Sequence, residues 1–319
     1  MATVMNKTTN MNTGTGATST KPNAYYDKLL LKLLVQTDFY HSKLAQQRPM
    51  PKRYGDTINF RKIKKLEPSL TPLTEGVTPD GLNGQVEAIS ATTKQYGDWM
   101  EFSDLVDVTM VDPVVEEYTV ELGRMMREKL DLLVRNELTE GSNVFYANEK
   151  TSRDALAVGD IPKIDDFRKI VLSMKKNHVK PAARGKYVAL VSPEVVFDLM
   201  DDEKFVKAYE IGRNNTPFLK GEIADVYGIK FVEVVNARVE ENTGGVPAHL
   251  SVVLGEQAYG ITTIKGNGDV EMIIKPLGSA GTSDPLNQRQ TIGAKVNAFV
   301  AKRLEEAAIV RYESVPTNA

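Results

Sequence analysis

The sequence predicts an α+β fold in which a long β-hairpin arm and one long helix are attached to a compact α/β region. Two strand-like stretches flank a segment rich in Pro and Gly, and an uninterrupted amphipathic stripe follows them. Short apolar strands then alternate with helical segments over the second half of the chain. The length of 319 residues is compatible with about two domains as a prior.

The N-terminal segment is polar. Residues 1–24 contain seven Thr and four Asn and no acidic residue, a composition that cannot bury enough apolar surface to fold alone. We expect either a disordered terminus or an arm that becomes ordered on a neighbouring subunit. Residues 25–47 place Tyr and Leu side chains at helical spacing, which predicts a short amphipathic helix.

The next stretch predicts a β-hairpin arm. Residues 52–65 carry six cationic residues and one acid, with apolar side chains interleaved as in a strand. Residues 67–84 contain three Pro and three Gly, which oppose both helix and sheet, and residues 85–102 are strand-like again. A two-stranded arm is marginally stable in water by itself, so we expect it to lie against another surface.

The clearest single element is a helix over residues 113–138. Asp112 suits the N-cap and Pro113 the first helical position, and acidic residues lie early in the segment while basic residues follow. One apolar stripe runs along its length, and Gly141 is a suitable stop. At 1.5 Å per residue such a helix is a rod of about 39 Å, long enough to serve as the spine of a domain.

The remainder predicts alternating helices and strands. We expect helices near 164–177 and 193–200 and strands near 187–191, 229–235, 250–254, 260–264 and 270–274. Both ends of residues 290–312 have the composition of β-strands, and the segment is expected to return the chain to the spine helix.

Composition excludes several classes of protein. Forty Lys and Arg against 42 Asp and Glu give a net charge of −2, which argues against a generally basic nucleic-acid binder. The absence of Cys removes disulfides, thiolate metal sites and a cysteine nucleophile. Apolar runs are too short for a membrane span, and no secretory signal is recognisable, so a cytoplasmic origin is the default.

The search for catalytic chemistry finds no candidate site. His41, His178 and His249 lack the spacing of a metal site, and a solvated or packing role is the better interpretation of each. The adjacent pairs Asp165–Asp166 and Asp201–Asp202 fit helix capping, because neighbouring residues do not face one another on a helix. No phosphate-binding loop and no nucleophile elbow is present, so an enzyme hypothesis has no catalytic residue to name, and we predict a protein without cofactor or metal that is not an enzyme.

Taken in order, the arm, the hairpin, the long helix, the α/β region and the returning strands resemble the major capsid proteins of tailed bacteriophages. Local sequence is similar to the subfamily related to the coat protein of the N-four podovirus. The most specific stretches are Thr71–Gly81 and Ser283–Lys295, and the similarity extends from about Tyr25 to Arg311. Ala294 departs from the aromatic residue that many relatives carry there.

The resemblance implies the Hong Kong 97-like major capsid fold, with an N-arm, an E-loop hairpin, a spine helix, a peripheral domain and an axial domain. The implied domain ranges are residues 1–48 for the N-terminal arm, 49–102 for the E-loop, 103–178 for the peripheral domain with its spine helix 113–138, 179–289 for the axial domain, and 290–319 for the return to the peripheral domain.

The implied function is self-assembly as hexamers and pentamers into the icosahedral head shell that encloses double-stranded DNA. Further implied partners are a separate scaffolding protein, a portal protein and DNA contacted non-specifically, with a decoration protein left open and no membrane. The implied location is the virion, after assembly in the host cytoplasm. Candidate intersubunit residues are the cations Lys52, Arg53, Arg61, Lys62, Lys64 and Lys65 and the acids Glu75, Asp80, Asp98 and Asp104.

Two other functions stay open at this point. One is a homo-oligomeric α/β enzyme of unknown substrate, with a site formed by loops near Asp201 and Gly255. The other is a nucleic-acid-binding module built on residues 52–65, which predicts binding that weakens steeply with salt.

Overall fold

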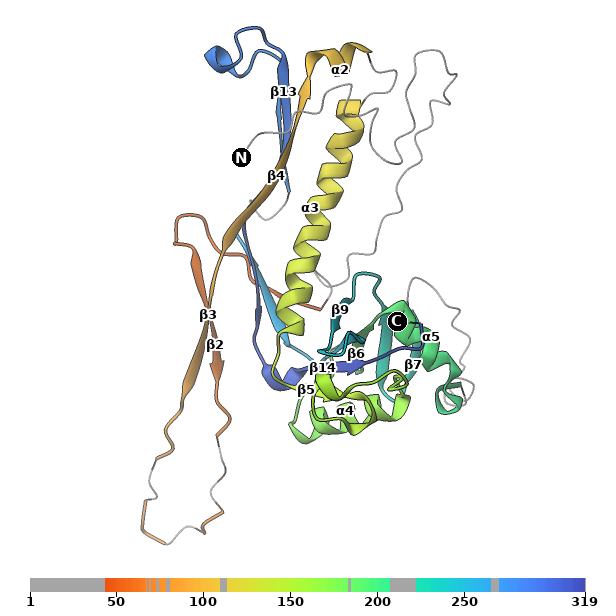
Figure 1. The fold of residues 1–319 in the computed structure, drawn as a ribbon. Coiled ribbons are helices and arrows are strands. Elements are labelled where there is room, and N and C mark those ends of the chain that lie inside the picture. Colours follow the sequence, from red (N-terminus) through yellow and green to blue (C-terminus); the bar gives the residue numbers. More distant parts are fainter. Residues whose placement is uncertain are drawn as a thin grey trace.

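The computed structural model describes residues 44–66, 68, 70–72, 75–78, 81–109, 114–182, 185–206, 222–264 and 270–318. The predicted helix over 25–47 lies almost entirely outside these ranges, as do Asp112 and Pro113. Figure 1 shows three parts: a projecting hairpin, a long helix that lies along an extended sheet, and a compact α/β unit. Within the described residues, no helix is both long and apolar enough to cross a membrane.

The hairpin is confirmed. Strands β2 (Thr57–Ile63) and β3 (Val86–Thr92) pair antiparallel, with Thr57 opposite Thr92 and Ile63 opposite Val86. The second strand-like stretch is divided, because the chain continues after Thr93 as β4 (Lys94–Ser103), which pairs with a C-terminal strand instead. The hairpin is therefore rooted in the body of the molecule through β4.

The long helix is confirmed as α3 (Val114–Thr139). It lies against a five-stranded sheet in which β13 (Arg289–Arg303) pairs with three other strands. One short helix, α2 (Asp104–Thr109), precedes α3 and was not predicted. The other strands of this sheet are β1 (Gln46–Gln47), β4, β11 (Tyr259–Thr263) and β12 (Glu271–Lys275).

The α/β unit is built on a seven-stranded mixed sheet flanked by helices α4 (Ile164–Lys176) and α5 (Pro193–Asp201). Both helices and the five predicted strands near 187, 229, 250, 260 and 270 are present, although the last two belong to the five-stranded sheet. The seven strands are β5 (Val144–Tyr146), β6 (Tyr187–Val191), β7 (Glu222–Val226), β8 (Ile229–Glu233), β9 (Arg238–Glu241), β10 (Pro247–Leu254) and β14 (Ile309–Ser314).

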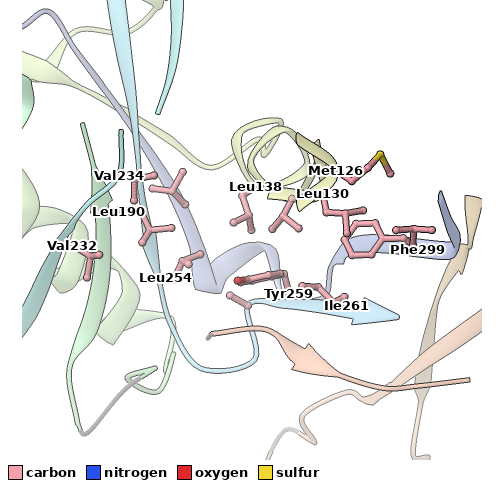
Figure 2. Packing of buried hydrophobic residues seen from close by; sticks show 14 of the residues in the cluster. Met126, Leu130, Leu138, Leu190, Val232, Val234, Leu254, Tyr259, Ile261 and Phe299 are labelled. Atoms are coloured by element: carbon pink, nitrogen blue, oxygen red, sulfur yellow. The ribbon is translucent and has the colours of Figure 1, made fainter. Parts of the chain in front are cut away.

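Two hydrophobic cores cover the two faces of the seven-stranded sheet. Because successive side chains of a strand point to opposite faces, Val188 and Leu190 of β6 join one core while Ala189 and Val191 join the other. Figure 2 shows the first core, in which Leu138 of α3 lies above Tyr259 and near the side chains of the sheet. The spine helix thus stabilises both sheets at once, while α4 and α5 cover the opposite face.

The sheets divide the chain differently from the expected domain ranges. Strands β11 and β12, which fall in the range expected for the axial domain, pair with β13 in the sheet along the spine helix. Strand β14, expected to return to the peripheral domain, lies in the seven-stranded sheet, as does β5. Helix α4 packs against one face of the same sheet. The chain crosses between the two sheets several times.

Candidate functional site

The base of the hairpin is fixed to the body by Phe60. This side chain of β2 is 4% exposed, and its ring lies against Gly260 of β11. A Cβ atom on residue 260 would lie 2.9 Å from Cε1 of the Phe60 ring, so only glycine fits there without a shift. The guanidinium carbon of Arg48 lies 5.7 Å from the centroid of the same ring, in cation–π geometry.

The six candidate cations lie along one exposed stretch. Lys52 and Arg53 form the turn that enters β2, and Arg53 has a φ of 69°. Arg61 and Lys62 lie on β2, and Lys64 and Lys65 follow it. Lys62 forms an ion pair with Glu305 of the same chain, so its charge is already partnered within the subunit.

The four candidate acids have different positions. Glu75 is exposed in the loop that joins β2 to β3, and Asp80 lies outside the described residues. Asp98 of β4 pairs with Lys129 of the spine helix at 2.6 Å between Oδ2 and Nζ. Asp104 accepts the backbone N–H of Leu105 at 2.8 Å at the start of α2. Asp98 and Asp104 are thus engaged within one subunit, whereas Glu75 faces solvent.

A cleft of about 770 Å³ lies between the hairpin base and the α/β unit. One wall is residues 60–65, and the facing wall is residues 177–180 after α4 together with Glu256 and Gln257. The lining is completed by Gln46, Arg48, Ile89, Leu304, Glu305, Ala307 and Ala308. Six cationic side chains line the cleft against two acids, so 6 − 2 gives a local charge of +4. The six cations are Arg48, Arg61, Lys62, Lys64, Lys65 and Lys180.

Sequence reasoning found four of these six cations and missed Arg48 and Lys180. It also missed Phe60 as the anchor of the hairpin and Glu305 as the partner of Lys62. The missed residues come from segments that are far apart in the sequence, and no local pattern distinguishes them. Only the pairing of β1 and β13 with β11 brings these segments together.

The histidine that comes nearest to a catalytic arrangement is His249 of β10. Its Nδ1 atom lies 2.9 Å from the Ser192 hydroxyl and 3.6 Å from the Glu194 carboxylate, and burial lowers the pKa of the imidazole. A nucleophile and an orienting acid must occupy different ring nitrogens, whereas both groups here lie at Nδ1. Ser192 also accepts the N–H of Val195 as the N-cap of α5. The packing role predicted for His249 is confirmed.

At the alternative enzyme site near Asp201 and Gly255, Gly255 itself is closely packed. A Cβ atom on residue 255 would lie 2.4 Å from Cγ1 of Val179 and 3.1 Å from the carbonyl oxygen of Lys180. Asp202 accepts the N–H of Ile164 at 3.1 Å, which confirms a capping role for this member of the carboxylate pair. Among the described residues, no cluster of three or more His, Asp or Glu side chains has metal-binding geometry.

Solved structures share this fold over nearly the whole chain. The capsid of Ralstonia phage GP4 covers 93% of this chain and 96% of its own at 14% identity, with a TM-score of 0.71. The cyanophage Pam1 capsid covers 95% and 98% at 14% identity, with a TM-score of 0.76. The SrpI encapsulin of Synechococcus elongatus covers 93% and 94% at 9% identity, with a TM-score of 0.59. The search of curated proteins gave no match.

The sequence itself matches the family model described as phage capsid protein over residues 86–312. This range begins at β3 and ends in β14, so it includes the spine helix and every strand of the two sheets except β1 and the last two residues of β14. The likeness to solved capsids shows the Hong Kong 97-like fold, and the family is structural and not enzymatic. The chain belongs to the phage capsid protein family, as a major capsid protein of the virion.

Proposed function

We propose that copies of this capsid protein assemble as hexamers and pentamers into an icosahedral shell that encloses double-stranded DNA. The observation that carries the proposal is the β2–β3 hairpin, which projects from the body (Figure 1) and exposes apolar and cationic side chains together. Ile63 is 76% exposed and Val86 61% exposed at its outer end. Apolar side chains gathered on such an arm are typical of a surface that a neighbouring molecule covers.

The hairpin, as the E-loop of residues 49–102, lies over a neighbouring subunit in this proposal. A two-stranded hairpin is marginal by itself, and contact with a neighbour supplies the missing packing. Residues 1–48 act as the N-arm on another subunit, and the spine helix reorients or straightens as the shell matures. The peripheral and axial domains and the subfamily related to the N-four podovirus remain predictions of the sequence.

The further partners follow from the same role. A separate scaffolding protein directs assembly, a portal protein occupies one vertex, and DNA is contacted without sequence specificity. A net charge of −2 supports weak contact with DNA, because a strongly basic inner surface would retain the phosphate backbone during packaging. Purification of mature particles tests whether a decoration protein is bound to them.

Negative-stain electron microscopy of the purified protein tests this function, with and without its neighbouring gene products. Closed shells, tubes or hexameric rings are the expected result. Regular shells formed by the protein alone would contradict the need for a scaffolding protein. A small uniform particle under every condition would contradict self-assembly itself.

A further inference from the structure

The cleft at the hairpin base runs along the free edge of a strand. Its lining includes six consecutive residues, 60–65, whose side chains alternate between the two faces of β2 and its extension. Ile89 of β3, the cross-strand partner of Phe60, also lines the cleft, so the cleft covers one face of the hairpin base as well as the β2 edge. In the described part of the chain, β2 pairs with β3 alone, so its other edge keeps unpaired backbone groups. Such an edge accepts an extended segment as an added strand.

The chemistry of the cleft selects an acidic and partly apolar occupant. Its charge is +4, and Ile63, Ile89 and Val179 contribute apolar surface beside the cations. Ile63 is 76% exposed and gains burial only when something fills the cleft. A nucleic-acid backbone would satisfy the charge but not the apolar side chains or the strand edge.

One segment of this same chain has that composition. Residues 66–84, at the tip of the hairpin, contain Glu67, Glu75 and Asp80 and no cationic residue, so the tip carries a charge of −3. Its described apolar side chains are strongly exposed, with Leu70 at 92%, Val77 at 62% and Leu82 at 66%. By contrast, residues 1–43 contain five Lys and two Asp, and 5 − 2 gives +3, the same sign as the cleft.

The tip begins directly after Lys65, the last cleft residue of this strand, and the hairpin projects from the body (Figure 1), so the tip is placed to meet another copy. We propose that the hairpin tip of one subunit docks along the β2 edge, in the basic cleft of the next subunit. Such a contact is heterologous, because two different surfaces meet, and its repetition closes a ring when the rotation between copies is right. The proposal rests on the proposed shell function and names the partner surface of the hairpin.

Charge exchange in the full-length protein tests the contact. Lys64→Glu with Lys65→Glu changes the cleft charge from +4 to 0, and Glu75→Lys with Asp80→Lys changes the tip charge from −3 to +1. Each pair of substitutions alone is expected to lower the yield of shells at least tenfold. Both pairs in one chain are expected to restore assembly. Lys175→Glu with Lys176→Glu is the matched control, because these exposed lysines lie outside the cleft lining.

Disulfide trapping gives a second and direct measurement, because the chain contains no Cys. Particles of a Lys64→Cys and Glu75→Cys double variant are oxidised and separated on a denaturing gel. A ladder of linked chains is expected, whereas each single variant should remain monomeric. A monomer band alone from the double variant, in particles that assemble normally, would overturn the proposal.

The outcomes separate this contact from the shell function. Failure of the unmodified protein to assemble with its neighbouring gene products contradicts the shell function. Normal assembly of all charge variants contradicts the contact while the shell function stands. If the cleft variant assembles normally but loses its packaged DNA, the cleft binds DNA phosphate groups. That result would overturn the proposal that the hairpin tip occupies the cleft.

Discussion

The Glu313 carboxylate is fully buried and receives the guanidinium of Arg153 on both oxygens. Arg153 Nε lies 2.7 Å from Oε2 and Nη2 lies 2.8 Å from Oε1, a bidentate geometry. Arg311 adds a third ion-pair contact, with its Nε 2.8 Å from Oε1. The hydrogen bonds that Arg153 donates to the Glu313 carboxylate raise the pKa of Arg153. This cluster fastens the last strand, β14, to the loop before α4.

Removal of the Glu313 charge should therefore destabilise the subunit. Glu313→Gln leaves Arg311, which is largely buried, without its anion, and breaking a buried pair in this way costs about 3 to 5 kcal/mol in general. Because Arg153 is 25% exposed, we expect the lower end, about 3 kcal/mol, in urea unfolding of the unassembled protein. Glu149→Gln is the control, since Glu149 is 77% exposed in its pair with Lys169 and its loss should leave the midpoint unchanged. Equal midpoints for the two variants would contradict the prediction.

A side chain at position 260 should displace the hairpin. Gly260→Val places atoms where the Phe60 ring and Leu304 lie, and overpacking of this kind costs about 1 to 3 kcal/mol. We expect proteases to cleave the hairpin of the variant faster than that of the wild type, while the body stays resistant. We also expect the variant to form fewer shells. Gly293→Ala serves as the control, because its Cβ would meet Trp99 Cβ at an ordinary 3.6 Å. Wild-type protease resistance of the hairpin in the Gly260 variant would show that Phe60 does not anchor it.

Truncation of the spine helix core should weaken both sheets together. Leu138 of α3 is fully buried between them, and a buried Leu→Ala change costs about 2 to 5 kcal/mol. Val120 lies on the same helix but is 72% exposed, so Val120→Ala should change the thermal midpoint of the free subunit far less. Circular dichroism melts of both variants measure the difference. A similar midpoint in the two would place Leu138 outside the core.

Acid should weaken the subunit through His249. Burial lowers the pKa of this imidazole below its ordinary value of 6.5, so the unfolded chain binds the proton more readily than the folded one. Stability is therefore lost as pH falls through 6.5 toward the folded pKa. Because His249→Gln cannot be protonated, the variant should lose less stability than the wild type between about pH 7 and 5. Parallel urea titrations at several pH values measure this difference, and equal losses would contradict the role of His249.

Periodicity in the sequence predicted the elements that local chemistry decides. The apolar stripe and the charge gradient along 113–138 predicted α3 to within one residue at each end, since a helix depends on side chains three or four positions apart. Alternation predicted β2, and the Pro- and Gly-rich segment placed the turn of the hairpin. The short helix α2 was missed because six residues carry too little periodic signal.

The sequence by itself determined that the arm is basic at its base, that the long helix is amphipathic and that the chain resembles phage capsid proteins. Only the tertiary structure decided that β4 leaves the hairpin for β13, and that Gly260 opens room for Phe60 from 200 positions away. It also decided that Lys62 and Asp98 are partnered within the subunit, while Lys64 and Lys65 line a cleft. The physical reason is that periodicity records the face a side chain occupies, whereas packing between distant segments selects the surface that it meets.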